Sequence, residues 1–381
     1  MIIVLLAISA LLALIGIFVL TDAGQLLRIG KTFVVAYFRF HIWIMALSIV
    51  LFLVALLLNI QQGVLQPWMM VVFGVCLAGC FLVTKYLAPY VMFRAKQHDA
   101  VYKSVPDAVA NDYLQPEDTV YVIEYNGVTK AFPQKYLWVS HIFGGDYGGD
   151  EVVLTYCVLT NLPVPFVNEL EGKPMNLKVL AQTNNNLLLW DTSSGEIIQQ
   201  ITNTCELSRR KLEPLPVLEM TWKAYQDLFP DGEVLYNPFT NPIERLLSKL
   251  MPLDDAHSGE RWMFKTVALD DARLPSKEKV IGIKDGADAV AYTKDYLRKN
   301  GVVNTRVGSK SIVIAHIPEH DLFVGFDRMN EGEEIEVTDV DVFGNTGEHG
   351  TLKRAFIYNG PMWAVWRHYN PDTQLFQLPK V

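Results

Sequence analysis

Cysteine is scarce in this chain, with four residues among 381. Cys76 and Cys80 lie one helical turn apart in an apolar run, where a packing role is more common than a metal pair. Only Cys157 and Cys205 remain for the rest of the chain, which is too few for a disulfide framework. This shortage agrees with a reducing compartment.

The chain also has no excess of positive charge and no familiar catalytic motif. Lysine and arginine total 33 against 41 aspartate and glutamate residues, for a formal net charge of −8, and no long basic run occurs. This balance argues against nucleic acid as a partner. The chain has no phosphate-binding glycine loop, no G-x-S-x-G nucleophile elbow and no H-E-x-x-H zinc motif. The sequence therefore names no reaction, cofactor, metal or protein partner.

Charge is absent from three stretches near the N-terminus. Residues 1–20, 42–60 and 67–84 carry none, and Pro89 beyond the third stretch is an expected kink. Because about 20 apolar residues cross a bilayer, we predict three transmembrane helices in a membrane domain at residues 1–93. The first stretch lacks a basic n-region and is longer than the usual signal-peptide core, so we favour a retained helix over a cleaved signal.

Basic residues near these stretches predict how the helices cross. The short loop at residues 61–66 has none. They lie in the first loop and after the third stretch, at Arg28, Lys31, Arg39, Arg94, Lys96 and Lys103. The positive-inside rule then places the soluble domain in the cytoplasm and the N-terminus outside. We expect a multi-pass protein of the cell (inner) membrane with the lipid bilayer as a partner, and an extracytoplasmic domain as the alternative.

The soluble part contains an internal duplication. Residues 120–166 align, almost without gaps, with residues 280–326, and both copies close on a similar stretch that begins at Trp222 or Trp363. A repeat of this length exceeds a solenoid unit and predicts two related subdomains packed together. The predicted divisions are a linker at 94–116, a first repeat at 117–236, a connection at 237–274 and a second repeat at 275–381.

Each copy carries signals for a tight strand pair, a short helix and a β-branched strand, in that order. The short helices are expected at residues 134–142 and 294–300, and the strands at residues 151–159 and 311–317. Strands dominate, and no alternation of strands with full-length helices appears. We therefore predict an α+β fold with mainly antiparallel sheet.

Comparison of the copies isolates a candidate site. Cys157 aligns with Ile317 and His141 with Gly301, so only the first copy holds a thiol and an imidazole. His141 is expected at the end of the short helix and Cys157 on the next strand, with a tight glycine loop between them. Such side chains can meet within a few ångströms, and an imidazole beside a thiol favours thiolate at neutral pH.

His141 and Cys157 can also be explained by purely structural roles, with no reactive thiol. Free cysteine is among the most buried residue types, and a histidine at a helix end can bond backbone carbonyls. On spacing alone we favour these structural roles. His316 and His320, four residues apart, form a weaker metal candidate because Pro318 interrupts the strand between them.

Several stretches occur together in an order known from one family. They are Ala131–Pro133 with His141, Val152–Cys157, the hairpin run Asn184–Asp191, and Leu212–Pro216 before Trp222. From about residue 105 to residue 381, the chain resembles the prokaryotic "domain of unknown function 3179" family. The resemblance implies no reaction. It implies candidate positions, since His141, Cys157, Asn184 and Gln200 match the family's histidine, first cysteine, hairpin asparagine and hairpin glutamine.

The chain departs from the family pattern at the cysteine. Family members typically show Tyr-Cys-Pro-Leu-Cys-Gly, whereas here Thr160 replaces the second cysteine and Asn161 replaces the glycine. A Cys-x-x-Cys pair could chelate a metal or cycle as a dithiol, but Cys157 alone can do neither. Cys205 would restore a second thiol only if the fold brought it close.

Two functions remain open, of which the first is the leading hypothesis and the second the alternative. In the first, a cleft in the first copy binds a small molecule or metal, with thiol chemistry as an option. There His141 would hold or deprotonate Cys157, and Asn184 and Gln200 would orient the bound group. In the second, the domain is a non-catalytic sensing or scaffolding module at the membrane, which the loss of the second cysteine favours. Whether the protein is an enzyme stays uncertain.

Overall fold

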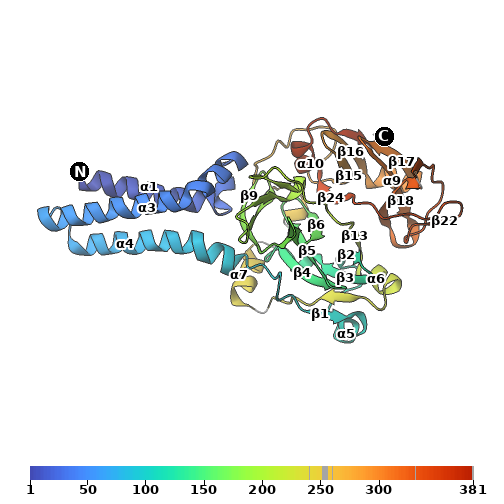
Figure 1. Ribbon diagram of the computed structural model, residues 1–381, viewed down its shortest axis with the longest axis horizontal. Coiled ribbons are helices and arrows are strands. Elements are labelled where there is room, and N and C mark those ends of the chain that lie inside the picture. The colour runs from blue at the N-terminus through green and yellow to red at the C-terminus, as the bar shows by residue number, and fades with distance from the viewer. Residues whose placement is uncertain (240, 251–255, 260, 331, 380–381) are drawn as a thin grey trace.

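The computed structural model describes residues 1–239, 241–250, 256–259, 261–330 and 332–379. A bundle of apolar helices stands at one end of the molecule and a β-rich domain at the other (Figure 1). The predicted α+β fold with mainly antiparallel sheet is confirmed.

Three helices are long and apolar enough to cross a membrane, in agreement with the three uncharged stretches. They are α1 (Ile2–Val19), α3 (Lys31–Gln62) and α4 (Pro67–Leu82), and α4 continues into η1 (Val83–Met92). Pro89 lies inside η1, which has the wider π-helical winding. Proline has no N–H for the usual i to i−4 hydrogen bond, so the winding changes where it sits.

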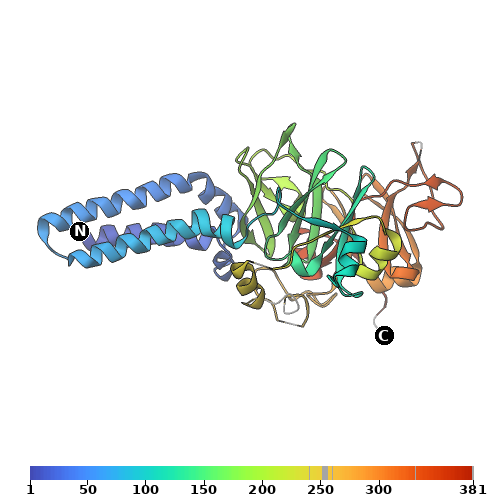
Figure 2. The same ribbon diagram turned by 90° about the horizontal axis from the view of Figure 1, so that it is seen from below.

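Helix α3 is longer than a bilayer requires. Its 32 residues span roughly 48 Å, against a hydrocarbon core of about 30 Å, so its first turns extend beyond the apolar run. The N-terminus and the α3–α4 loop lie at the end of the bundle away from the β-rich domain (Figures 1 and 2). The connection between α1 and α3, which contains α2 (Ala23–Leu26), lies against that domain.

The first part of the β-rich domain, which ends before β15, has three larger sheets and one two-stranded sheet among the residues that the structure describes. One has the order β1 (Tyr102–Ser104), β14 (Glu233–Leu235), β3 (Val128–Pro133), β2 (Thr119–Tyr125), β13 (Leu218–Thr221). The second is β4 (Ile142–Tyr147), β5 (Asp150–Cys157), β6 (Leu162–Val167), and the third is β12 (Thr204–Cys205), β11 (Ile197–Gln199), β10 (Asn186–Asp191), β9 (Leu177–Thr183). Short elements complete it: α5 (Val105–Ala110), η2 (Gln134–Tyr136), β7 (Glu169–Leu170), β8 (Lys173–Pro174), η3 (Gln200–Thr202), α6 (Trp222–Leu228) and α7 (Pro242–Leu250).

The second part contains two larger sheets of its own. One has the order β24 (Tyr358–Met362), β15 (Lys279–Asp285), β16 (Asp288–Thr293), β25 (Gln374–Phe376), and the other is β17 (Val302–Val307), β18 (Lys310–Ile317), β19 (Leu322–Asp327). The remaining elements are α9 (Lys294–Asn300), η4 (Pro318–His320), β20 (Met329–Asn330), β21 (Glu333–Glu334), β22 (Asn345–Thr346), β23 (Gly350–Thr351) and α10 (Trp363–Tyr369).

The two parts share a strand order. In the first, β14 runs parallel to β3, and β3, β2 and β13 are antiparallel neighbours. In the second, β25 runs parallel to β16, and β16, β15 and β24 follow in the same antiparallel order. This correspondence agrees with the internal duplication, which stays a prediction.

One of the two predicted short helices is wrong. Residues 134–142 form only the 3-10 turn η2 followed by turns, and β4 begins at Ile142. Leu137, Trp138 and Val139 are all buried there, because tertiary packing overrides the local helical pattern. The companion helix is confirmed as α9, and the predicted β-branched strands appear as β5 and β18.

A shared core joins the two parts. One cluster of buried side chains runs from Cys157 in the first part to Trp363 and Trp366 in the second. Backbone and side-chain hydrogen bonds cross the same boundary. Asn161 Nδ2 donates to the Gly360 carbonyl oxygen at 2.8 Å, and the Met362 amide donates to the Thr160 carbonyl oxygen at 2.9 Å.

Candidate functional site

His141 sits between the η2 turn and β4, and it is fully buried. Its φ of 61° places it in the left-handed region. The Nδ1 atom lies 2.9 Å from the carbonyl oxygen of Tyr156, which can only accept, so Nδ1 carries the proton and donates. Burial lowers the pKa of His141 to about 4, although this hydrogen bond raises it. The ring is therefore neutral at physiological pH.

Cys157 ends β5 and is also fully buried. Its Sγ lies 3.4 Å from the Thr160 hydroxyl, 3.6 Å from the Asn185 carbonyl oxygen and 3.9 Å from Gln182 Oε1. Burial raises the pKa of the thiol to about 11, while the Thr160 hydroxyl lowers it. The group is therefore a protonated thiol, whose hydrogen can be donated to the Asn185 carbonyl oxygen or to Gln182 Oε1 and whose sulfur can accept from the Thr160 hydroxyl.

The structure does not join the two predicted partners by a hydrogen bond. Among the described residues, the His141 ring bonds only to the Tyr156 carbonyl oxygen and packs against Phe93. The pKa of its imidazole is lowered and that of the Cys157 thiol is raised. An imidazolium–thiolate pair shifts both groups in the opposite directions, because each charge stabilises the other.

Gln182 on β9 lies next to both the Cys157 and the His141 side chains. Its Oε1 faces the Cys157 sulfur, and it lines the same small cavity as His141 and Asp22. That cavity has a free volume of about 10 Å³, which is room for about one water molecule. The candidate centre therefore leaves no space for a substrate-sized molecule.

The connection between α1 and α3 covers this centre. Asp22 Oδ2 accepts a hydrogen bond from Gln182 Nε2 at 3.2 Å, and Gln25 Oε1 accepts one from the Asn185 amide at 3.0 Å. Burial raises the pKa of Asp22 to about 6, against the lowering effect of the Gln182 hydrogen bond. The connection between α1 and α3 thus covers one side of this centre, and Met263 and Phe264 line the same small cavity.

The two side-chain amides predicted to bind a ligand are those of Asn184 and Gln200, and only that of Asn184 is partly exposed. Asn184 and Asn185 form the two-residue turn between β9 and β10, with φ values of 49° and 57° that suit a type I′ turn. The Asn184 side chain is half-buried and makes no hydrogen bond to any described residue.

Gln200 is buried, and both polar atoms of its side-chain amide are hydrogen-bonded. Its Nε2 donates to the Thr155 and Leu162 carbonyl oxygens at 3.1 and 3.0 Å, and its Oε1 accepts from Asn186 Nδ2 at 2.8 Å. The amide thus ties the β5–β6 corner to β10 and has no free atom for a ligand. Of the four predicted site residues, His141, Cys157 and Gln200 are sealed in the core.

Thr160 and Asn161, the two residues that depart from the family pattern, both make hydrogen bonds in their surroundings. Thr160 Oγ1 lies 2.5 Å from the Asn185 carbonyl oxygen as well as beside the Cys157 sulfur, so a hydroxyl now occupies the place of a second thiol. Asn161 has φ 57°, a backbone conformation that asparagine tolerates nearly as well as glycine. Its Oδ1 accepts from Gln134 Nε2 at 2.7 Å, within a buried network that includes Tyr121 and Tyr156.

Sequence reasoning missed Asp22, Gln182 and Asn185. One signal was available: Asp22 is the first charged residue of the chain and directly follows an apolar run. An acidic group in that place needs a polar partner, and Gln182 is that partner. Nothing in the sequence indicated which residue, some 160 positions away, would supply it.

The weaker candidates have ordinary roles. Cys157 and Cys205 are both free thiols, and burial raises the pKa of Cys205 to about 11. His316 Nε2 lies 2.8 Å from Asp321, whose carboxylate is also held by Arg298 at 2.8 and 2.9 Å. Across the described part of the chain, no three histidine, cysteine or acidic side chains gather in a way that could hold a metal ion.

Comparison with known proteins identifies one relationship. Residues 98–373 match the family model described as "Protein of unknown function (DUF3179)". No curated protein and no solved structure matches the chain.

Proposed function

The chain belongs to this DUF3179 family of proteins of unknown function, and we propose that it is a membrane-anchored sensing or scaffolding module without thiol catalysis. The observation that carries the proposal is the state of Cys157. Its sulfur is fully buried and surrounded by neutral oxygens, and its pKa is raised to about 11.

The raised pKa argues against a nucleophile. At pH 7, a thiol with a pKa of about 11 is ionised in roughly one molecule in 10⁴. Reactive cysteines instead have pKa values of about 3.5–7.5, held there by cations or helix N-termini. His141 supplies no such cation, because burial keeps its imidazole neutral.

A small-molecule site with thiol chemistry is the second candidate. It is favoured by the polar groups that meet at the Cys157 sulfur, namely Gln182, Asn185 and Thr160. It requires the α1–α3 connection to move, because Asp22 and Gln25 now cover that centre. In this alternative the ligand would displace a segment of the membrane bundle.

We also propose that the three apolar helices anchor the protein in the cell membrane with the β-rich domain in the cytoplasm. The support is the charge pattern: Arg28, Lys31 and Arg39 lie between α2 and the first turns of α3, Arg94 follows η1, and the loop at residues 61–66 has no basic residue.

Alkylation of the intact protein tests the main proposal. Iodoacetamide should label Cys157 at least about 100-fold more slowly than an exposed thiol at neutral pH, because its thiolate is so rare. The matched control is Ser193→Cys, which places a thiol on an exposed turn of the same hairpin sheet. Peptide mass mapping separates the sites. Labelling of Cys157 as fast as that control would refute the inert module and support the thiol alternative.

A further inference from the structure

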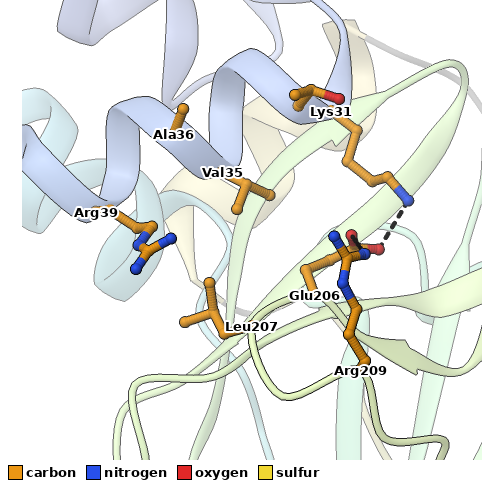
Figure 3. Close-up of a pocket in the computed structure, with 8 residues that line it drawn as sticks. Lys31, Val35, Ala36, Arg39, Glu206, Leu207 and Arg209 are labelled. Atoms are coloured by element: carbon orange, nitrogen blue, oxygen red, sulfur yellow. Dashed lines mark hydrogen bonds and ion pairs between the residues drawn. The ribbon is translucent and has the colours of Figure 1, made fainter.

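A second feature lies where the helix bundle meets the β-rich domain. An open pocket of about 550 Å³ forms between the first turns of α3 and the segment after β12. Figure 3 shows Lys31, Val35 and Arg39 on the helix, facing Glu206, Leu207 and Arg209 on the segment. This pocket is separate from the sealed centre around Cys157.

The pocket is strongly basic. Lys31, Arg39 and Arg209 face a single carboxylate, that of Glu206. Glu206 is buried, lies 2.7 Å from Lys31 Nζ and 3.6 Å from an Arg209 nitrogen, and so offsets only part of this charge. Arg39 has no carboxylate partner among the residues that the structure describes. The excess charge is therefore positive and open to an anion.

The pocket also has apolar residues in its wall, and it lies close to the start of the uncharged run of α3. Val35 and Leu207 line it, and Leu207 is 42% exposed. The uncharged run of α3 begins at Ile42, so Arg39 lies about 4.5 Å before it along the helix axis and Lys31 about 12 Å further. A headgroup layer is about 5–7 Å thick, which places Arg39 within it if α3 spans the membrane as proposed above.

We propose that this pocket binds the phosphate of an anionic phospholipid headgroup. The Arg39 and Arg209 guanidinium groups approach the phosphate oxygens from the helix and from the facing segment, while Lys31, farther from the apolar run, pairs with Glu206. Guanidinium groups suit phosphate because their paired N–H donors match its oxygens.

Native mass spectrometry of the full chain in nanodiscs tests the proposal. The discs contain phosphatidylcholine alone or mixed with phosphatidylglycerol. We expect the wild-type protein to retain phosphatidylglycerol selectively. Arg39→Gln and Arg209→Gln should each weaken this retention about 5-fold, since a basic residue near an anionic surface contributes about that much. Arg39→Lys should lose less than Arg39→Gln, because it keeps the charge.

The control is Arg306→Gln, which removes an exposed arginine on β17 at the far side of the β-rich domain. Equal retention by this control and by the Arg39→Gln/Arg209→Gln double variant would overturn the proposal. Inorganic phosphate that displaces the lipid at equal concentration would also overturn it, since the site would then bind a free anion.

The lipid proposal rests on the proposed membrane crossing, and the two can fail separately. Release of the protein from membranes by carbonate at high pH would reject the crossing whatever the lipid result. Firm membrane retention without lipid selectivity would reject only the pocket.

Discussion

The buried imidazole of His141 makes the stability of the first part depend on pH. Its pKa falls from 6.5 to about 4 on folding, because burial disfavours the charged ring. The unfolded chain therefore binds the proton first on acidification. This contribution to stability is complete above about pH 6.5 and is lost as the pH falls to about 4, with a total of roughly 3 kcal/mol.

We expect His141→Asn to reduce the fall in melting temperature between pH 6.5 and pH 4. Asparagine tolerates the left-handed φ of 61° and can still donate to the Tyr156 carbonyl oxygen, but it does not titrate. Circular dichroism melts across that range measure the effect. His257, whose pKa is also lowered to about 4, keeps part of the dependence in both proteins. His320→Asn is the control, and identical pH profiles for His141→Asn and wild type would contradict the argument.

Thr160 shows how one substitution changes the chemistry available. Its hydroxyl takes the hydrogen bond to the Asn185 carbonyl oxygen and lies 3.4 Å from the Cys157 sulfur. The family's second cysteine would stand in the same place. The loss of a dithiol at this position therefore needs no rearrangement of the backbone around it.

The α1–α3 connection is the element on which access to the Cys157 centre depends. Desolvation raises the pKa of Asp22 to about 6, so its protonated form suits the docked position better. Stability from this group is complete below about pH 3.8 and is lost as the pH rises through about 6. The connection therefore docks less firmly at neutral pH than in mild acid.

Asp22→Asn should tighten that docking at pH 7.5. The amide keeps an oxygen for Gln182 Nε2 and removes the charge that burial disfavours. We expect amide hydrogen exchange at Asn185, which donates to Gln25, to slow by about 3- to 10-fold. Asp112→Asn, on an exposed turn, is the matched control. Exchange that does not respond to Asp22→Asn at neutral pH would show that this carboxylate does not weaken the docking.

Helices and strands could be predicted where the local residue pattern determines the structure. The apolar runs and the helix α9 follow from residue pattern alone. The helix expected at residues 134–142 failed because Leu137 and Trp138 are held in a core assembled from distant strands. Local propensity is a weak guide where such packing decides.

At the scale of the molecule, the sequence could locate the candidate residues but not their surroundings. The copy comparison isolated His141 and Cys157, but their surroundings include Gln182 and Asn185, which bond to Asp22 and Gln25 of the α1–α3 connection. That contact joins residues about 160 positions apart. No local pattern encodes such a pairing, so the sealed state of the centre had to come from the structure.

The arrangement of the bundle predicts opposite sides for two points of the chain. The α3–α4 loop lies at the end of the bundle away from the β-rich domain (Figure 2). We expect a fluorescent reporter at the C-terminus to be active in the cytoplasm, and alkaline phosphatase inserted at Gly63 to be active outside. Phosphatase activity at the C-terminus would reverse the proposed orientation. Activity of the same reporter at both points would exclude a bilayer crossing by α4.

The uninterrupted course of α3 from Lys31 to Gln62 has a mechanical consequence. A continuous helix moves as a stiff rod, so tilting it at one end displaces the other. A thinner bilayer favours greater tilt of a long apolar helix. Such a tilt swings Lys31 and Arg39 relative to Glu206 and pulls on the short stretch that covers Gln182. If α3 crosses the bilayer as proposed above, we expect bilayer thickness to influence the contact between Asp22 and Gln182.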